Sequence, residues 1–287
     1  MSRPVSLFTD LDRTLIPNGA QEESPGVREM LGTLVHRGLV ELIYVTGRDA
    51  ALVRAAISEY GLPGPAAVIA DVGTSIYEPG RGSWRALSEW RERILRDFAG
   101  HSPARLAAAL EDQGDLRLQE PEHQGPAKLS YYVSPDADPD VVRAAVETRL
   151  ATLGVHVRVI CSIGEAAGLV DVVPRSAGKW HAIEYLLEER DIDRERAIFA
   201  GDSGNDLEVF AAPLRSILVA NATREVREAA IRLVEAAGHR ETLYLARGGY
   251  LGTDGNYCSG ILEGLAEAFP EVDEALKERS RFTRGLC

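Results

Sequence analysis

The chain of 287 residues contains short, almost uninterrupted apolar runs that alternate with segments carrying helix-end signals. The runs are Val5–Thr9, Val40–Val45, Ala66–Ala70, Ala197–Ala200 and Ile217–Ala220. Such a run is typical of a strand that is buried on both faces, and its alternation with helices indicates a parallel sheet. The sequence therefore predicts an α/β fold with a Rossmann-like parallel sheet.

Helices are marked by the residues expected at their ends. A capping side chain followed by proline occurs at three places, Ser24-Pro25, Ser102-Pro103 and Asp138-Pro139, and predicts a helix that starts at each proline. Asp49 is expected to cap a helix that ends near Tyr60, because Gly61 follows there. A further helix is expected over residues 176–189.

The middle of the chain departs from this alternation. Between residues 82 and 175 the pattern is helix, helix, strand, strand, helix, strand, strand, which is typical of an α+β unit. Its expected strands are Leu116–Gln119, Leu129–Val133, Val155–Ile160 and Leu169–Val173. Segments 77–83 and 174–178 are rich in glycine, proline and serine and are expected to be hinges. We predict a core of residues 1–81 and 176–287 with residues 82–175 inserted as a second domain.

Polar side chains follow three of the apolar runs directly. These pieces are Asp10-Leu11-Asp12-Arg13-Thr14, Thr46-Gly47-Arg48 and Gly201-Asp202-Ser203-Gly204-Asn205-Asp206. Ligands bind beyond the carboxyl ends of parallel strands, so one crevice can collect all three pieces. A lone Lys179 follows the inserted segment. Each piece alone is most often an ordinary turn or an exposed helix residue, and the last piece also suits a calcium-type loop. Their joint order favours a functional site.

Carboxylates two residues apart are suited to phosphoryl transfer. Asp10 or Asp12 can attack phosphorus while the other protonates the leaving alkoxide and later activates water. If Asp12 is the acid, it needs a raised pKa, which we expect repulsion by Asp10 to supply. A carboxylate at ~3.5 Å from a phosphate dianion is repelled by roughly 9 kcal/mol at an effective dielectric of ~20. Cations must therefore lie beside the pair.

The cations that the sequence offers are Mg²⁺ and a lysine. Mg²⁺ takes oxygen ligands and usually keeps several waters, so Asp10, Asp202 and the backbone carbonyl of Asp12 are sufficient. Lys179 is expected to hold phosphoryl oxygens as a point charge. Thr46 and the backbone amides after it would bind the remaining oxygens at the start of the following helix.

Together these pieces resemble the four motifs of the haloacid dehalogenase (HAD) superfamily, and the resemblance covers the whole chain. The motifs are Phe8–Leu15, Val45–Arg48, Lys179 and Gly201–Asp206. The inserted segment resembles the α+β cap (C2B type) of type IIB phosphatases. Within that group the chain is most similar to sucrose-phosphate phosphatases, through Asp71–Thr74, Gln119–Tyr132, Val170–Pro174 and Ser203–Glu208.

The resemblance implies a role for each motif residue. Asp10 is the implied nucleophile, which forms an aspartyl-phosphate, and Asp12 is the implied acid/base. Thr46 and Lys179 complete the catalytic set. The implied phosphate or substrate contacts in the core are Thr46, Gly47, Arg48, Lys179 and Asn205. The implied metal site is formed by Asp10, Asp12, Asp202 and Asp206.

Arg13 departs from the superfamily pattern, which commonly has glycine at this position. Glycine suits a turn with positive φ, whereas arginine tolerates it poorly. The turn is therefore either ordinary, or it is left-handed and Arg13 reaches toward the substrate. The loop over residues 248–255 precedes a helix and suggests no role.

The cap is expected to select the substrate. Glu122, Lys128 and Ser130 are our candidates for contacts with sugar hydroxyls, and Asp171 is either a similar contact or a hinge residue. The alternative for Lys128 is a solvated lysine beside an edge strand.

Composition excludes some partners and favours a compartment. The formal charge of 32 − 44 = −12 disfavours nucleic acid and anionic membranes as partners. The N-terminus does not read as a signal peptide, and no apolar run approaches the length of a membrane helix. Three widely spaced cysteines suit a reducing compartment. We expect a cytoplasmic protein.

The sequence thus predicts a Mg²⁺-dependent phosphatase that acts on a phosphorylated sugar, with sucrose 6-phosphate as the leading substrate. Mannosylfructose phosphate and mannosyl-3-phosphoglycerate are close alternatives. A sugar phosphomutase on the same scaffold and a non-catalytic sugar-phosphate-binding partner of a glycosyltransferase are the other two hypotheses.

Overall fold

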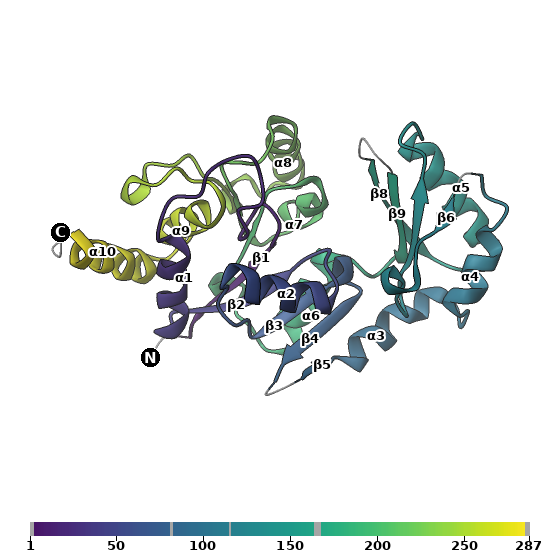
Figure 1. The fold of residues 1–287 in the computed structure, drawn as a ribbon, viewed down its shortest axis with the longest axis horizontal. Coiled ribbons are helices and arrows are strands. Elements are labelled where there is room, and N and C mark those ends of the chain that lie inside the picture. The colour runs from purple at the N-terminus through teal and green to yellow at the C-terminus, as the bar shows by residue number, and fades with distance from the viewer. Residues whose placement is uncertain (1–2, 81–82, 115, 164–167, 285–287) are drawn as a thin grey trace.

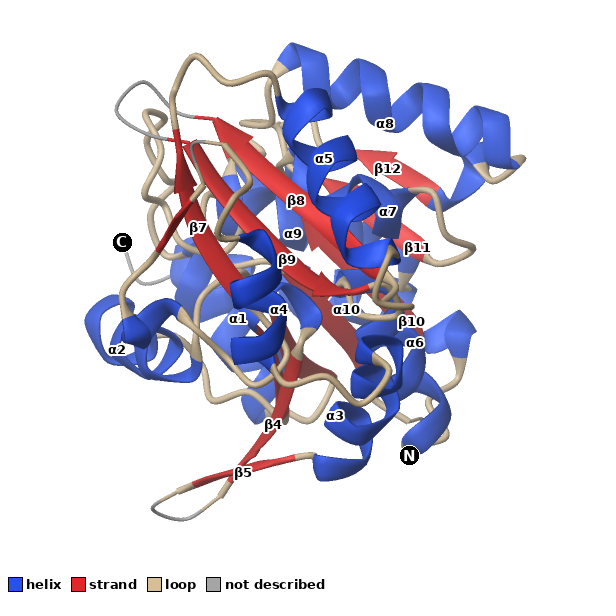
Figure 2. Cartoon of the chain, turned by 90° about the vertical axis from the view of Figure 1, so that its right-hand side faces the viewer, coloured by secondary structure: helices blue, strands red, loops and turns tan. Residues whose placement is uncertain are grey.

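The computed structural model describes residues 3–80, 83–114, 116–163 and 168–284. Figure 1 shows a larger body that carries both termini and a smaller body that is linked to it by two chain segments. The larger sheet has eight strands in the order β12-β11-β10-β1-β2-β3-β4-β5, and the smaller has four in the order β6-β7-β9-β8. Figure 2 shows the smaller sheet in front of the larger one.

The strands of the larger sheet are β1 (Val5–Thr9), β2 (Val40–Val45), β3 (Ala67–Ala70), β4 (Ser75–Pro79), β5 (Trp84–Ala86), β10 (Ala197–Gly201), β11 (Arg215–Leu218) and β12 (Leu243–Leu245). Those of the smaller sheet are β6 (Arg117–Leu118), β7 (Leu129–Val133), β8 (Val157–Ile163) and β9 (Gly168–Pro174). The helices are α1 (Val27–His36), α2 (Ala50–Tyr60), α3 (Ser88–Leu95), α4 (Pro103–Leu110), α5 (Pro139–Ala151), α6 (Lys179–Glu189), α7 (Leu207–Phe210), α8 (Arg224–Ala237), α9 (Tyr257–Ala268) and α10 (Pro270–Arg284).

The larger sheet is parallel except at one edge, which confirms the α/β expectation. β1 lies between β2 and β10, and all three run in the same direction. Every residue of β1 and β10 is buried, as expected for strands covered on both faces. In the register, Thr9 lies opposite Tyr44 and Ala200. The loops after these three strands therefore start side by side at one edge of the sheet.

Two hydrophobic layers cover the larger sheet. Alternate residues point to opposite faces of a strand, so Leu7 packs with α1, α2, α9 and α10. Phe8 packs on the other face with α3, α6, α7 and α8. A third cluster joins α4 and α5 to the four-stranded sheet. Each sheet thus has its own core.

Most of the expected helix ends are confirmed. The Asp49 carboxylate accepts hydrogen bonds from the amides of Ala51 and Leu52 at the start of α2, and Gly61 ends that helix with φ +60°. Ser102 and Asp138 cap α4 and α5 in front of proline.

The expectation at Ser24-Pro25 is wrong, because α1 begins at Val27 after a left-handed Gly26. The Ser24 hydroxyl instead accepts a hydrogen bond from the Asp254 amide. The α6 helix begins at Lys179 rather than at residue 176, because Gly178 has an extended left-handed backbone with φ +145°.

The expected run Ile217–Ala220 is displaced in the structure. β11 ends at Leu218, and the amides of Val219 and Ala220 bond to the carbonyls of Gly201 and Gly255. The Val219 amide still bonds to the last residue of β10, and the pairing with that strand ends at Ala220, whose amide bonds to the loop at Gly255 instead.

The expected hinge at residues 77–83 is part of a hairpin instead. β5 pairs with β4 in an antiparallel register, so the larger sheet continues to Ala86. Residue 82, the expected start of the cap, lies outside the described residues. Beyond β5, the order α3, α4, β6, β7, α5, β8, β9 agrees with the expected series. The division of the chain into two domains stays a prediction.

No helix within the described ranges is both long and apolar enough to cross a membrane.

Gly73 connects the sheet to the start of α6. It has φ +88°, and a Cβ atom there would lie 2.3 Å from the backbone carbon and oxygen of Gly178, next to Lys179. We expect Gly73→Ala to lower the free energy of unfolding by about 3 kcal/mol, from left-handed strain and a backbone clash together. Urea unfolding measures the loss.

The matched control is Gly38→Ala. Gly38 has φ +68° with open space around its Cα, so the strain remains and the clash is absent. We expect this variant to lose only about 1 kcal/mol. Equal losses in the two variants would contradict the close approach at Gly73.

Candidate active site

The loops at the carboxyl edge of the larger sheet bring the predicted motif residues together. Asp10 follows β1, Thr46 follows β2 and Asp202 follows β10, while Lys179 opens α6. All four side chains are buried. These residues, distant in the chain, therefore lie at the same edge of the sheet.

Lys179 is the centre of the cluster. Its fully buried ammonium donates hydrogen bonds to Asp206 Oδ1 at 2.6 Å and to Asp10 Oδ1 and Asn205 Oδ1 at 2.9 Å. Burial alone would lower the pKa of Lys179, but the two carboxylates raise it well above its ordinary value. Lys179 therefore stays protonated and fixes three acceptors from two loops.

The contact with Lys179 offsets only part of the effect that burial has on the pKa of Asp10. Burial raises the pKa of Asp10 to about 7, Lys179 opposes that rise, and repulsion by Asp206 adds to it. The hydrogen bonds that the described residues donate to its side chain go to Oδ1. The second carboxylate oxygen has no such protein donor.

Asp206 closes its own loop. Its Oδ2 accepts hydrogen bonds from the amides of Asp202 and Ser203 at 3.1 Å and from the Ser203 hydroxyl at 3.2 Å. Gly201 leaves room for this carboxylate, because a Cβ atom there would lie 2.6 Å from Asp206 Oδ2. The spacing of glycine and acid in this motif therefore follows from the fold of the loop.

A hard divalent cation fits between the acids. Oxygen atoms of Asp10, Asp202 and Asp206 all lie within 4.8 Å of one another. Burial and repulsion by Asp206 raise the pKa of Asp202 to about 6. Its buried Oδ2 makes no hydrogen bond within the described part of the chain. Such oxygen ligands suit Mg²⁺.

The carboxylate of Asp12 lies outside that group of oxygens, although the sequence analysis named it as a ligand. Arg48 holds it with two hydrogen bonds, 2.8 Å from Nε and 2.6 Å from a terminal nitrogen, and Asn18 adds a third at 2.7 Å. Burial raises the pKa of Asp12, but these hydrogen bonds outweigh it and the pKa is lowered. The expected rise in the pKa of Asp12 is therefore wrong, because the charged group that contacts its carboxylate is Arg48 rather than Asp10.

Arg13 has a left-handed backbone with φ +59°, so the first alternative, an ordinary turn, is wrong. Its Nε lies 3.4 Å from Asp202 Oδ2. The guanidinium thus faces the acidic cluster.

The second motif forms a compact loop beside the sheet. Thr46 is buried, and its hydroxyl accepts a hydrogen bond from the Arg48 amide at 3.2 Å. The amides of Asp71 and Val72 bond to the carbonyls of Arg48 and Thr46. Gly47 is exposed beside them. Asp71 and Val72 both have positive φ, a constraint that no local pattern in the sequence indicated.

The cap candidates occupy different surroundings. Lys128 is buried and pairs with Asp71 of the core at 3.0 Å, so the solvated alternative is wrong. The Ser130 hydroxyl lies 2.5 Å from Asp171 Oδ1 inside the cap sheet. Glu122 is exposed and lines a cavity of about 270 Å³ that Asp71 also lines. Their contact with a sugar stays a prediction.

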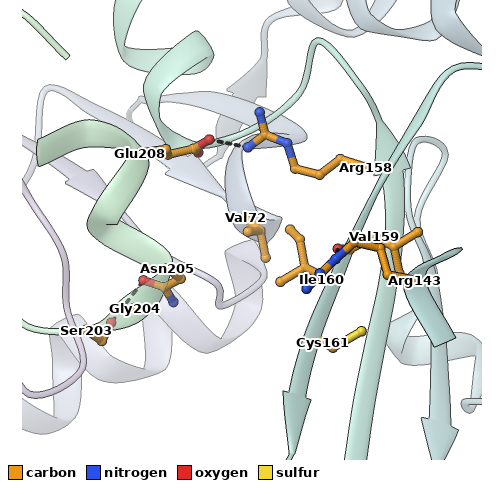
Figure 3. Close-up of a pocket in the computed structure, with 10 residues that line it drawn as sticks. All are labelled: Val72, Arg143, Arg158, Val159, Ile160, Cys161, Ser203, Gly204, Asn205 and Glu208. Carbon is orange, nitrogen blue, oxygen red and sulfur yellow. Dashed lines mark hydrogen bonds and ion pairs between the residues drawn. The ribbon is translucent and has the colours of Figure 1, made fainter. Parts of the chain in front are cut away.

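A cleft of about 450 Å³ separates the cap from the acidic loop. Figure 3 shows Ile160 and Cys161 on its cap side and Ser203 and Asn205 on the opposite side. An ion pair between Arg158 of β8 and Glu208 of α7 links the two sides. The cleft therefore opens beside the residues that Lys179 holds.

Sequence reasoning missed two asparagines at this site. Asn18 contacts Asp12, and the buried Asn221 donates a hydrogen bond to the Arg13 carbonyl at 2.7 Å. Asn221 follows the apolar run of β11, and that position was the one available signal.

A parallel sheet with these four motifs at its carboxyl edge and a capping second sheet defines a capped phosphatase of the haloacid dehalogenase class. The chain belongs to the sucrose-6F-phosphate phosphohydrolase family, a family of phosphoric monoester hydrolases whose profile matches residues 3–267.

Individual relatives agree with that assignment. A Nitrosococcus oceani protein described as a HAD-like hydrolase is 46% identical over 95% of this chain and 74% of its own length. Sucrose-phosphatase 1 of Nicotiana tabacum is 30% identical over 77% of this chain, which spans 51% of the tobacco protein. The crystal structure of the sucrose-phosphatase from Synechocystis sp. PCC6803, in complex with sucrose and phosphate, superimposes with a TM-score of 0.73 and 27% identity over 93% of this chain and 98% of that one.

The buried ammonium of Lys179 makes a pH-dependent prediction. Lys179→Met leaves two buried carboxylates without their cation, and we expect a loss of about 3–5 kcal/mol of unfolding free energy at pH 8. The pKa of Asp10, about 7, lies above its ordinary value of 3.8. A carboxyl group whose pKa is raised by folding destabilises the folded state increasingly as the pH rises from its ordinary pKa to the raised one. Lys179 holds that pKa down, so in Lys179→Met the pKa of Asp10 rises further and the variant is destabilised over a wider pH range than the parental chain. At pH 5 we therefore expect a smaller loss, by about 1–2 kcal/mol.

Urea unfolding in EDTA at both pH values measures these losses. Lys277→Met is the control, because Lys277 makes a half-exposed ion pair with Asp273 on α10. We expect it to lose under about 1 kcal/mol at either pH. A loss at Lys179 that is the same at pH 5 and pH 8 would contradict the charge argument.

Proposed function

We propose that this chain is a Mg²⁺-dependent phosphatase that hydrolyses a phosphorylated sugar through an aspartyl-phosphate on Asp10. The observation that carries the proposal is the Lys179-centred cluster of Asp10, Asn205 and Asp206. It lies at the sheet edge where ligands bind in such folds. Membership of a phosphohydrolase family supports the reaction class.

Asp10 acts as the nucleophile in this scheme. One of its carboxylate oxygens bonds to phosphorus while the ester bond to the sugar oxygen breaks, and Asp12 gives its proton to that oxygen. Asp12 then takes a proton from water, which attacks the phosphorus. The acyl-phosphate bond breaks, and inorganic phosphate and free Asp10 result. Both proton transfers end with Asp12 in its starting state.

Lys179 and the metal reduce the repulsion between Asp10 and the phosphate. Asp10, Asp202 and Asp206 would hold the metal, with the backbone carbonyl of Asp12 beside them. Mg²⁺ supplies positive charge to the phosphoryl oxygens when it is bound. Thr46 and the amides that follow it bind the remaining oxygens.

Arg48 controls the protonation of Asp12. While Arg48 holds its carboxylate, the pKa of Asp12 is lowered, and the ionised form, which has no proton to give, is favoured. A phosphoryl group bound at the Thr46 loop competes for the guanidinium, which suits bidentate contact with phosphate. Transfer of Arg48 to the phosphate frees Asp12 and allows its pKa to rise.

Sucrose 6-phosphate is the substrate we propose first. The tobacco and Synechocystis relatives support it by name, although this chain spans only half of the tobacco protein. We also propose a cytoplasmic location, which the three widely spaced cysteines support because they suit a reducing compartment.

Asp10→Asn should abolish Mg²⁺-dependent turnover and leave the fold intact. The amide keeps the size of the side chain and its contact with Lys179, but it cannot form the acyl phosphate. We expect kcat to fall by at least ~10³-fold with an unchanged circular-dichroism spectrum. Appreciable residual activity would rule out the nucleophile assignment.

The substrate class is tested by a panel of glycosyl phosphates with Mg²⁺ and with EDTA. Sucrose 6-phosphate is expected to give the highest kcat/KM, ahead of mannosylfructose phosphate and mannosyl-3-phosphoglycerate, and EDTA is expected to remove all turnover. Phosphate release is measured beside isomer formation, since isomer formation would indicate a phosphomutase. A flat profile would contradict the choice of sucrose 6-phosphate, and binding without turnover would favour a non-catalytic partner.

A further inference from the structure

Asn221 joins two distant parts of the chain at the edge of the active site. Only 5% of this residue is exposed. Its Nδ2 donates a hydrogen bond to the Arg13 carbonyl at 2.7 Å, and its Oδ1 accepts one from the Tyr257 amide at 2.8 Å. One amide side chain therefore connects the catalytic loop after β1 to the start of α9.

Both of its partners have backbone conformations that L-amino acids disfavour. Arg13 has φ +59° and Tyr257 has φ +50°. A non-glycine residue in the left-handed region is disfavoured by about 5- to 30-fold in population. Conformations of this kind persist only where surrounding contacts hold them.

An amide is the side chain that satisfies both partners. A backbone carbonyl can only accept a hydrogen bond, and a backbone amide can only donate one. A carboxylate in place of Asn221 would still accept from Tyr257, but it would face the Arg13 carbonyl with another acceptor.

Asn18 contacts the backbone amide of Arg13, whereas Asn221 contacts its carbonyl. Asn18 Oδ1 accepts from the Arg13 amide at 2.8 Å, and Asn18 Nδ2 donates to Asp12 Oδ1 at 2.7 Å. Two asparagines thus bracket the Arg13 backbone, and one of them, Asn18, also contacts the carboxylate of the neighbouring Asp12.

Asn221 is itself held by the loop over residues 247–255. The Ala220 amide bonds to the Gly255 carbonyl at 2.9 Å. The buried Glu263 accepts hydrogen bonds from the amides of Arg247 and Gly248. A Cβ atom at Gly255 would lie 2.5 Å from the Gly248 amide nitrogen, so the loop is closed tightly on itself. The loop over residues 248–255, to which the sequence assigned no role, therefore supports the turn after β11 that carries Asn221.

We propose that Asn221 is a positioning residue for the acid/base Asp12. It holds Arg13 in the left-handed conformation and so fixes the turn that carries the Asp12 carboxylate. The inference rests on the proposed function only where it names Asp12 as the acid/base.

A positioning role and a merely structural role of Asn221 differ in how the effect of its loss depends on the residue at position 13. If Asn221 served only the start of α9, its loss would have the same effect with any residue at position 13. If it holds a strained Arg13, the loss should shrink when glycine, which adopts positive φ without that cost, replaces Arg13.

The test is a double-mutant cycle of Asn221→Asp and Arg13→Gly, with p-nitrophenyl phosphate and Mg²⁺ as the assay. We expect Asn221→Asp to lower kcat by about tenfold, the middle of the strain range, with KM within about threefold. Compared with Arg13→Gly alone, the double variant should lose less than about threefold. Asn256→Asp is the matched control, since it adds the same charge at a side chain that makes no capping hydrogen bond, and it should keep the parental kcat.

A second measurement does not need turnover. Hydrogen exchange of peptides that cover residues 10–18 should be at least about tenfold faster in Asn221→Asp than in the parental chain, and unchanged in Asn256→Asp. If Asn221→Asp does not fold, Asn221→Ala, which places no acceptor opposite the Arg13 carbonyl, takes its place in both measurements.

Equal losses of kcat in both backgrounds would overturn the proposal, and so would unchanged exchange at residues 10–18. A parental chain without turnover would contradict the proposed function instead, and the exchange measurement would still decide the role of Asn221.

Discussion

The buried ammonium of Lys179 is the contact on which the architecture of the site depends. A charge without solvent is tolerated only when it is paired and hydrogen-bonded, and Lys179 has three acceptors from the loops after β1 and β10. Lys179 is also the first residue of α6, where the chain returns from the cap. The same contact therefore fixes the nucleophile and the point at which the cap joins the core. The close approach of Gly73 to Gly178 secures this junction from the side of β3.

Negative charge exceeds positive charge at the centre of the site. The carboxylates of Asp10, Asp202 and Asp206 lie close together, and Lys179 pairs with the first and the third. The raised pKa values of Asp10 and Asp202 reflect this excess of negative charge. A bound divalent cation would remove it, and a phosphate dianion could then approach. Arg13 and Arg48 lie at the rim, where each pairs with one aspartate. Arginine side chains thus supply positive charge at the edge of the site, and the acidic group at its centre could bind a metal ion.

The sequence predicted what depends on local pattern and missed what depends on side-chain direction. Apolar runs and caps such as Asp49 located the sheet and most helices, because burial and capping act over a few residues. Glycine and proline near Tyr77 are equally typical of a hairpin turn and of a hinge. Only the pairing of β5 with β4 shows that this segment belongs to a hairpin. The pKa of Asp12 could not be predicted, because the direction of Arg48 sets it. The ion pair between Lys128 and Asp71 could not be predicted for the same reason, because it depends on the direction of the Lys128 side chain.

Backbone strain occurs in the catalytic loops, as it does at four other non-glycine positions of the described chain, Ala99, Asp191, Leu251 and Tyr257. Arg13, Asp71 and Val72 all have positive φ without being glycine, and each conformation costs of order 1–3 kcal/mol. Asn221 and Asn18 fix the first of them, and the carbonyls of Thr46 and Arg48 accept hydrogen bonds from the other two. Contacts from separate loops therefore maintain the geometry, and a loop released from its neighbours would relax. It follows that the shape of this site depends on all the loops at the carboxyl edge of the sheet. They include the loop over residues 247–255, which supports Asn221.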